Sequence, residues 1–200
     1  MQTVRTEYWV DQMWATPEYQ QMKVDNFNSV DSELTSAPKT ILDIGCGLAW
    51  ESRLFNEKYG SELWLLDGDT SSNSNKPENA NDVGWNETSD HFLFYTPLSQ
   101  LKNQLDELGT KNYHLIDANN INIPDDIKFD IITSWVSCGF HYPANTYKEL
   151  IQKHSHKDTR IFLDLRARLK TFDIVSSDVE IVKVVKSYGK RVTAEIRFKS

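Results

Sequence analysis

Short runs of apolar residues alternate with helix-like segments along most of this 200-residue chain. The apolar runs span residues 40–44, 63–66, 113–116, 129–136 and 161–165. Nearly continuous apolar strands are typical of a parallel sheet that is covered on both faces. Helical spacing marks the segments between them, residues 49–59, 97–108 and 145–154. This alternation predicts a doubly wound α/β fold with a mostly parallel sheet.

The C-terminal part of the chain changes to a different pattern. An apolar-rich run at residues 179–185 is followed by a turn at residues 187–190. Residues 192–198 then alternate apolar and polar side chains, which is the pattern of a strand with one buried face. We therefore expect an antiparallel hairpin that closes the mostly parallel sheet.

The length of the chain favours a single domain, residues 1–200, with enough apolar residues to form a core. Two segments do not fit the alternation of strands and helices. Residues 1–36 are rich in aromatic side chains, and residues 70–90 are polar and rich in turn formers. A structureless stretch of that length within a compact domain is usually a functional lid or disordered. We expect residues 70–90 to be a loop insertion, either a lid or a mobile surface segment.

The charge balance is acidic, with a formal net charge of -7. Phosphate binding requires clustered Lys and Arg, so an acidic chain disfavours nucleic acid and anionic membranes as partners. No apolar run approaches the ~20 residues of a membrane span, and the N-terminus lacks the apolar core of a signal peptide. Cys46 and Cys138 fit a reducing compartment, as small buried side chains. We therefore expect a cytoplasmic protein.

The most informative segment is LDIGCG at residues 42–47, where a predicted strand runs into a glycine-rich turn and then a predicted helix. Gly45 and Gly47 let the backbone turn tightly and approach a ligand, although they could serve the turn alone. A dinucleotide-binding turn would have a third glycine where this chain has Trp50. Asp43 would also repel a pyrophosphate, whereas it suits a ligand with an amino group or a sulfonium charge. A nicotinamide-dependent oxidoreductase is therefore disfavoured.

This segment resembles the first motif of the Rossmann-like, class I S-adenosylmethionine-dependent methyltransferases. The family has a further small residue near the position of Ala49, and alanine is compatible with it. The resemblance covers roughly residues 38–165, and the C-terminal hairpin fits the last two strands of the family. It implies a Rossmann-like fold with S-adenosylmethionine as the cofactor.

The resemblance also implies roles for residues at the ends of the predicted strands. Asp67 would accept hydrogen bonds from both ribose hydroxyls, with Asp69 as the alternative. Asp117 would take the adenine amino group, unless it only caps a turn. Ser134 and Trp135 would line the methionine part and the transferred methyl, unless Trp135 only packs in the core. The implied cofactor-binding set is Asp43, Gly45, Cys46, Gly47, Asp67, Gly68, Asp117, Ala118, Ser134 and Trp135.

A hydroxyl acceptor of a methyl group needs alignment and a base. His141 follows the fourth apolar run, where an acceptor would approach, and it titrates near neutral pH. It is the candidate base, and a turn residue bonded to the backbone is the alternative. Asp164 is a weaker candidate for positioning the acceptor. We expect no metal site, because the HSHKD segment at residues 154–158 has the hydrophilic surroundings of a solvated helix end.

The expected function is methyl transfer from S-adenosylmethionine to a small-molecule acceptor, by O-methylation of a hydroxylated compound or a sugar. The alternative is a non-catalytic module that binds S-adenosylmethionine or a partner protein. The Asn/Asp-Pro-Pro-aromatic tetrapeptide of DNA amino-methyltransferases is absent after the fourth run. Few residues separate the fifth run from the hairpin, so residues 1–36, the loop at 70–90 or another chain should cover the acceptor site.

Overall fold

The computed structural model of the protein describes residues 16–68, 97–140, 143–166, 178–189 and 191–199. In chain order, the elements are α2 (Pro17–Asp31), β1 (Thr40–Ile44), α3 (Trp50–Tyr59), β2 (Glu62–Asp67), α4 (Leu98–Glu107), β3 (Tyr113–Asp117), β4 (Phe129–Ser134), the 3-10 helix η2 (Ala144–Tyr147), α5 (Lys148–Lys153), β5 (Ser155–Arg166), β6 (Val179–Tyr188) and β7 (Arg191–Phe198).

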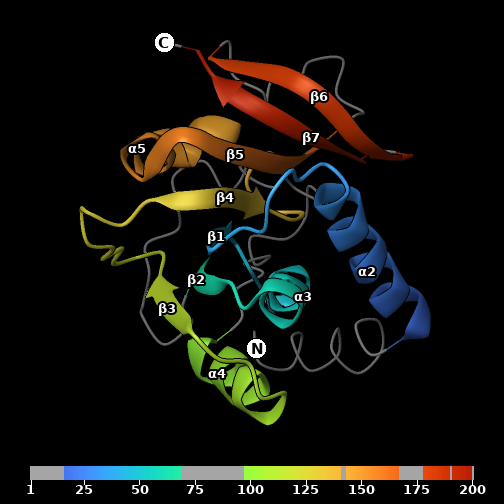
Figure 1. Ribbon diagram of the computed structural model, residues 1–200, viewed down its shortest axis with the longest axis vertical. Helices are drawn as coiled ribbons and strands as arrows, with labels where there is room; N and C mark the ends of the chain where they lie inside the picture. The colour runs from blue at the N-terminus through green and yellow to red at the C-terminus, as the bar shows by residue number, and fades with distance from the viewer. Residues whose placement is uncertain (1–15, 69–96, 141–142, 167–177, 190, 200) are drawn as a thin grey trace, which may run out of the picture.

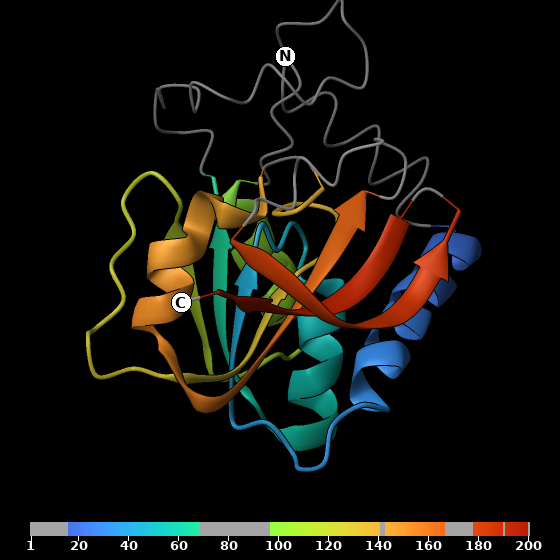
Figure 2. The same cartoon turned by 90° about the horizontal axis from the view of Figure 1, so that it is seen from above.

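Seven strands form one sheet in the order β3-β2-β1-β4-β5-β7-β6 (Figure 1). The first five strands pair in parallel, and β7 is antiparallel to both β5 and β6. The parallel strands therefore end at one edge, here named the carboxyl edge; the arrowheads of β2 and β5 point toward it in Figure 2. The predicted α/β fold, with a mostly parallel sheet and a C-terminal antiparallel hairpin, is confirmed.

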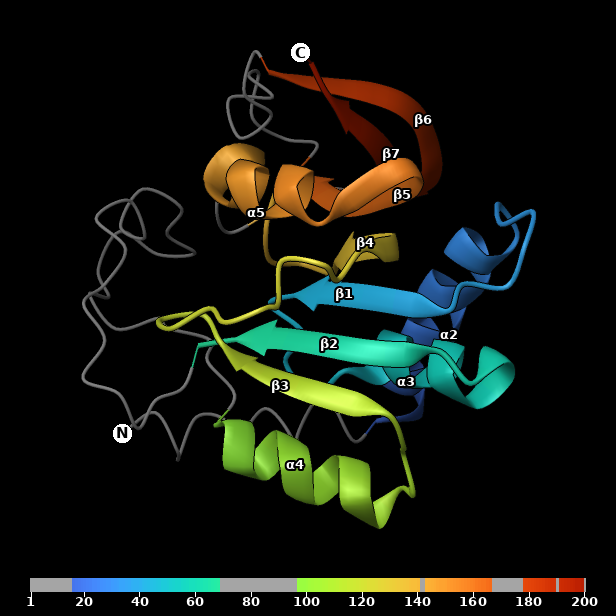
Figure 3. The same ribbon diagram turned by 60° about the vertical axis from the view of Figure 1, so that its left-hand side comes forward.

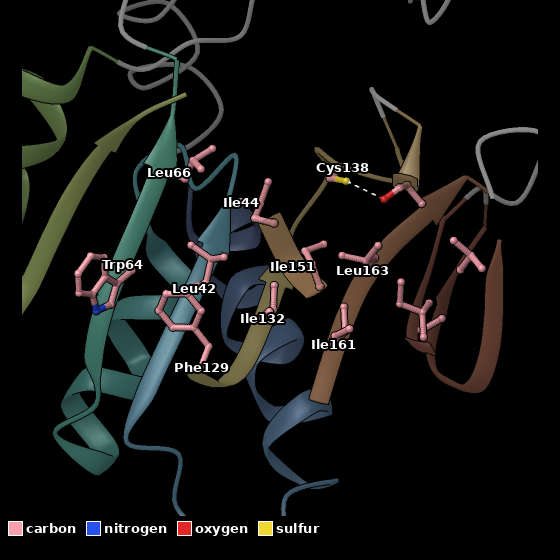
Figure 4. Close-up of a cluster of buried hydrophobic side chains, with 14 of the residues drawn as sticks. Leu42, Ile44, Trp64, Leu66, Phe129, Ile132, Cys138, Ile151, Ile161 and Leu163 are labelled. Atoms are coloured by element: carbon pink, nitrogen blue, oxygen red, sulfur yellow. Dashed lines mark hydrogen bonds between the residues drawn. The ribbon is translucent and has the colours of Figure 1, made fainter. Parts of the chain in front are cut away.

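Helices cover both faces of the sheet, and an apolar cluster lies under each cover. On one face Phe27 of α2, Phe55 of α3 and Leu101 of α4 pack against the strands. On the other face Ile151 of α5 packs over Leu42 and its neighbours, as Figure 4 shows. Figure 3 shows α5 in front of the sheet, with α2 and α3 behind it. None of the helices in the described ranges is long and apolar enough to cross a membrane.

Helix α2 lies in the aromatic-rich N-terminal segment, and the strand–helix pattern misses it. A start signal is nevertheless present, because the Thr16 side chain accepts a hydrogen bond from the N–H of Tyr19 and Pro17 occupies the first turn. The buried side of the helix includes Lys23 and Asn26 next to apolar residues. These polar residues weaken the apolar stripe from which a helix is usually predicted.

Two expectations about polar side chains are wrong: that the second hairpin strand has only one buried face, and that His154 lies in a solvated helix end. β7 buries residues on both faces, because α2 packs over the hairpin, and Arg191 and Thr193 are 8% and 0% exposed. His154, expected in a solvated helix end, is 1% exposed. Its Nδ1 lies 2.9 Å from the carbonyl oxygen of Ile127, and its ring packs beside Phe129. Contacts with the rest of the fold, which a local pattern does not contain, bury these side chains.

Candidate functional site

The backbone of the turn between β1 and α3 is held against the end of β2. The N–H groups of Gly45 and Cys46 both donate to the carbonyl oxygen of Leu66, at 2.7 and 3.1 Å. The N–H of Gly47 donates to Oδ2 of Asp67 at 2.7 Å. These three N–H groups are used within the protein. A ligand at this turn would therefore not find these N–H groups as donors, and the carbonyl oxygen of Cys46 already accepts from the N–H of Ala49 at 2.8 Å.

Gly45 also permits a close approach of the loop that follows β4. Its φ is +69°, and a Cβ built on it would lie 1.9 Å from Oγ of Ser137. Ser134, at the end of β4, donates to the carbonyl oxygen of Ile44 at 2.7 Å and accepts from the N–H of Cys138 at 2.8 Å. The loops at the carboxyl ends of β1 and β4 are therefore locked against each other.

Two acidic residues end the neighbouring strands β2 and β3. Asp67 and Asp117 are direct partners in the parallel ladder, and the N–H of Ala118 donates to the carbonyl oxygen of Asp67 at 2.8 Å. Oδ1 of Asp67 accepts from the N–H of Gly68 at 2.7 Å. Oδ1 of Asp117 accepts from the N–H and the amide of Asn119, both at 2.8 Å, so Asp117 does cap a turn. The two carboxylates lie side by side at the carboxyl edge.

Asp43 lies beneath the glycine turn and is 1% exposed. Ser52 of α3 donates its hydroxyl to Oδ2, whereas Oδ1 has no hydrogen-bond partner in the described part of the chain. Burial raises the pKa of Asp43 to about 7. The nearby Glu51 carboxylate also raises this pKa, whereas the hydrogen bond from Ser52 lowers it. Asp43 therefore ties β1 to α3 and changes its charge near neutral pH.

The residues that follow β4 form a strained turn. Val136 has a φ of +54°, which a β-branched residue rarely adopts. Its N–H donates to Oδ2 of Asp164 at 3.0 Å. Trp135 is 6% exposed and packs into the apolar cluster under α2 and α3, and its Nε1 has no hydrogen-bond partner among the described residues. Strain of this kind persists only where the surrounding structure holds it, and it clusters at functional sites.

A buried polar network holds Asp164 in place. Asp164 is 0% exposed, accepts from the hydroxyl of Thr193 at 2.6 Å and lies 3.3 Å from Nη1 of Arg191. Burial raises the pKa of Asp164, although Arg191 and Thr193 oppose the rise. Nη2 of Arg191 donates to Oδ1 of Asn26 at 3.2 Å. The carboxylate that supports the strained turn is thus linked to α2.

The network continues from α2 to α3. Asn26 donates to Oε1 of Glu51 at 2.9 Å, and Nζ of Lys23 lies 2.8 and 3.1 Å from the two oxygens of the same carboxylate. Desolvation lowers the pKa of Lys23, but the Glu51 carboxylate more than offsets this, and the net pKa is raised. Removing one partner of a buried ion pair typically costs about 3–5 kcal/mol. The pair therefore fixes α2 against α3.

The expected cofactor-binding residues gather at the carboxyl ends of β1 to β4: Asp43, Gly45, Cys46, Gly47, Asp67, Gly68, Asp117, Ala118, Ser134 and Trp135. Ser134, Asp43 and Asp67 are buried and bonded to the chain, so their contacts give each of them a role in holding the turn. Direct contact of any member of the set with a cofactor stays a prediction. The candidate base His141, the alternative ribose ligand Asp69 and the loop at 70–90 lie outside the described residues.

Several residues that shape this site escape the sequence reasoning. Ser137 and Val136 carry no signal, because a left-handed residue in a loop is invisible to a hydrophobic pattern. Lys23 and Glu51 look like ordinary surface charges of two helices. Asp164, already a candidate for positioning the acceptor, does carry a sequence signal, since a carboxylate within the apolar run IFLDL is costly to bury without partners.

No protein-family profile matches the sequence, and no curated protein matches it. The fold, however, is shared with solved structures. A ribosomal protein L11 methylase from Lactobacillus delbrueckii subsp. bulgaricus has a TM-score of 0.59 at 12% identity, over 92% of this chain and 81% of that chain. A SAM dependent methyltransferase from Aquifex aeolicus has a TM-score of 0.58 at 14% identity, over 90% and 93%. A mutant of MtNAS in complex with S-adenosylmethionine has a TM-score of 0.58 at 12% identity, over 100% and 72%.

The chain has the Rossmann-like fold of the class I methyltransferases. The fold that the resemblance in the glycine turn implies is therefore confirmed. In this methyltransferase fold the candidate site is the carboxyl edge, where the turn after β1, the ends of β2 and β3 and the loop after β4 meet.

We expect Gly45→Ala to destabilise the protein more than Gly60→Ala. Both glycines have a φ of +69°, but a Cβ meets Ser137 at Gly45 and nothing within 4 Å at Gly60. The left-handed conformation costs each alanine about 1–2 kcal/mol, and overpacking should add about 1–3 kcal/mol at Gly45 only. Urea unfolding of both variants measures the difference. Equal losses in the two variants would show that Ser137 moves away freely.

We expect the stability of the wild type to fall, through Asp43, as the pH rises from about 4 to about 7. The folded-state pKa of Asp43, about 7, lies above its ordinary value of 3.8, so in this window only the folded state holds the proton. Asp43→Asn removes this contribution, and the stability of the variant relative to wild type should improve as pH rises. Urea unfolding across this range measures it, with exposed Asp125→Asn as the control. Parallel pH profiles for wild type and Asp43→Asn would refute a buried titrating carboxyl.

Proposed function

We propose that this chain binds S-adenosylmethionine at the carboxyl edge and transfers its methyl group to an acceptor. The observation that carries the proposal is the pair of neighbouring carboxylates, Asp67 and Asp117, beside the left-handed turn at Gly45. Ligands of open α/β sheets bind outside the carboxyl ends of the strands. The methyltransferase fold, and a structural neighbour in complex with S-adenosylmethionine, support the same cofactor.

The groups at this edge fit the polar groups of S-adenosylmethionine. Its ribose hydroxyls, adenine amino group and ammonium donate hydrogen bonds, and carboxylates and carbonyl oxygens accept them. Asp67 would hold the ribose hydroxyls and Asp117 the adenine amino group. The carbonyl oxygens of residues 45–47 would hold the ammonium, because the N–H groups of this turn already donate within the protein.

The electrostatics of the edge also favour a positively charged ligand. Asp67 and Asp117 supply negative charge from adjacent strands, and Asp43 adds to it where it is ionised. A pyrophosphate would be repelled by the same groups. A sulfonium and an ammonium would be attracted, which favours S-adenosylmethionine over a dinucleotide.

When bound, S-adenosylmethionine supplies an electrophilic methyl group on a sulfonium whose leaving group is a neutral thioether. The chain then has to align the acceptor and keep water away. The loop after β4 suits this task, because Ser134 and Asp164 hold its backbone rigidly. His141 comes directly after this loop in sequence, and we assign it the role of the base that takes the proton from an acceptor hydroxyl.

The proposed acceptor is a small hydroxylated compound or a sugar. The net charge of -7 argues against nucleic acid, because a nucleic-acid site needs clustered cations. A protein side chain is the second candidate, because one structural neighbour is a ribosomal protein methylase. Measuring the release of S-adenosylhomocysteine separates the two candidates. Release with hydroxylated small molecules favours the first, and release with protein extracts favours the second.

We expect S-adenosylmethionine and S-adenosylhomocysteine to bind the wild type, and Asp67→Ala to bind both at least tenfold more weakly, a loss of about 1.4 kcal/mol. Calorimetric titration measures this, and a thermal melt checks that the variant folds. Asp125→Ala, at a carboxylate that is 86% exposed, is the matched control and should bind like wild type. A folded wild type that binds neither compound would overturn the proposal.

A further inference from the structure

Positive charge collects where β5, β6 and β7 meet the carboxyl edge. Arg166 ends β5, and its partner in the antiparallel ladder is Arg191, the first residue of β7. Arg191 is in turn paired with Tyr188, at the end of β6. Two residues further along the ladder, Lys186 is paired with Thr193. Residues directly opposite in a ladder have Cβ atoms about 4.5–5.5 Å apart, so Arg166 neighbours Arg191 and Arg191 neighbours Tyr188. Three cations therefore lie on adjacent strands at this end of the sheet.

Ring contacts link this group together. Nζ of Lys186 lies 4.2 Å from the centre of the Tyr188 ring, and the guanidinium of Arg191 lies 4.7 Å from it. The guanidinium of Arg166 lies 4.9 Å from the centre of the Phe140 ring, in the loop after β4. Tyr188 therefore contacts two of the cations, and Phe140, in the loop after β4, contacts the third.

The charges of this group are incompletely balanced. Asp164 pairs with Arg191, but neither Arg166 nor Lys186 has an ion-pair partner in the described ranges. Nζ of Lys186 and Oη of Tyr188 are shielded from solvent, and among the described residues neither has a hydrogen-bond partner. Burying an ammonium without a partner is costly, and like charges placed opposite each other repel. In a chain with a net charge of -7, this local excess of cations needs an explanation.

The group is connected to the strained turn after β4 through one carboxylate. Asp164 accepts from the Val136 N–H at 3.0 Å and faces Arg191 at 3.3 Å. The turn that we assign to the acceptor and the cationic group therefore share Asp164 as a partner. The cationic groups belong to β5, β6 and β7, whereas the acidic groups Asp67 and Asp117 belong to β2 and β3. The carboxyl edge is thus acidic at one end and basic at the other.

We propose that Arg166, Lys186, Tyr188 and Arg191 bind an anionic group of the methyl acceptor, a carboxylate or a phosphate. The inference rests on the proposed methyltransferase function and adds the acceptor class to it. Lys186 and Tyr188 supply the two donors that lack partners among the described residues, and the guanidinium of Arg166 matches the planar, two-oxygen face of such an anion. Arg191 is already bonded to Asp164 and Asn26 and adds positive charge beside them. The acceptor is accordingly a hydroxylated acid or a phosphorylated hydroxy compound.

The first test uses inorganic phosphate and succinate as probes on the full chain, saturated with S-adenosylhomocysteine, at ionic strength matched with sodium chloride. We expect a saturable rise in melting temperature with at least one of them, which identifies the phosphate or the carboxylate as the preferred anion. Lys186→Gln and Arg166→Gln should weaken binding at least fivefold, whereas Lys186→Arg should retain it. Lys183→Gln is the matched control on β6, because Lys183 pairs with Glu33 instead.

A second readout separates binding from mere stability. We expect Lys186→Gln to raise KM for hydroxylated acids, with little change in kcat, and to leave their amides unaffected. The anion site would be overturned if Lys186→Gln bound each anion as tightly as the wild type does. It would also be overturned if neither anion raised the melting temperature more than sodium chloride does at the same ionic strength. Binding of S-adenosylhomocysteine in those same samples would leave the methyltransferase proposal standing. Anion binding without any binding of S-adenosylhomocysteine would instead overturn the methyltransferase proposal and the acceptor role with it.

Discussion

The close contact between the turn after β1 and the loop after β4 is the constraint on which the candidate site depends. A side chain at Gly45 would occupy the place of Ser137, and the hydroxyl of Ser134 bridges the two loops beneath that contact. Because β1 and β4 are central neighbours in the sheet, this contact fixes the middle of the carboxyl edge. The carboxylates of β2 and β3 then lie on one side of it, and the cations of β5 to β7 lie on the other.

Polar side chains, in addition to the apolar cluster under α2, connect this edge to the N-terminal helix. The Lys23–Glu51 pair joins α2 to α3, and Arg191 links α2 to Asp164, which in turn supports the strained Val136. Such networks are costly to bury and are useful only when each member has a partner. Any displacement of α2 would leave several charges unpaired at once, so the position of α2 and the shape of the acceptor side are coupled.

Much of this architecture is predictable from the sequence, because each of the five parallel strands contains an apolar run, and the first three end at a glycine or an aspartate. The glycine turn and the acidic strand ends also follow from local residue types. Helix α2 is missed because Lys23 and Asn26 interrupt its apolar stripe, and their partners lie far away in the sequence. The buried Arg191 and the left-handed Val136 are missed for the same reason: tertiary contacts, and not local propensity, place them there.

The central claim is that S-adenosylmethionine binds at the carboxyl edge, between the glycine turn and the ends of β2 and β3. The most direct test is amide chemical-shift mapping by NMR during titration of S-adenosylhomocysteine into the full chain. The account predicts the largest shifts at the amides of residues 45–47, Gly68 and Ala118, with little change at Gly60 and Asn112 at the opposite edge. Shifts confined to that opposite edge, or none at saturating ligand, would contradict it.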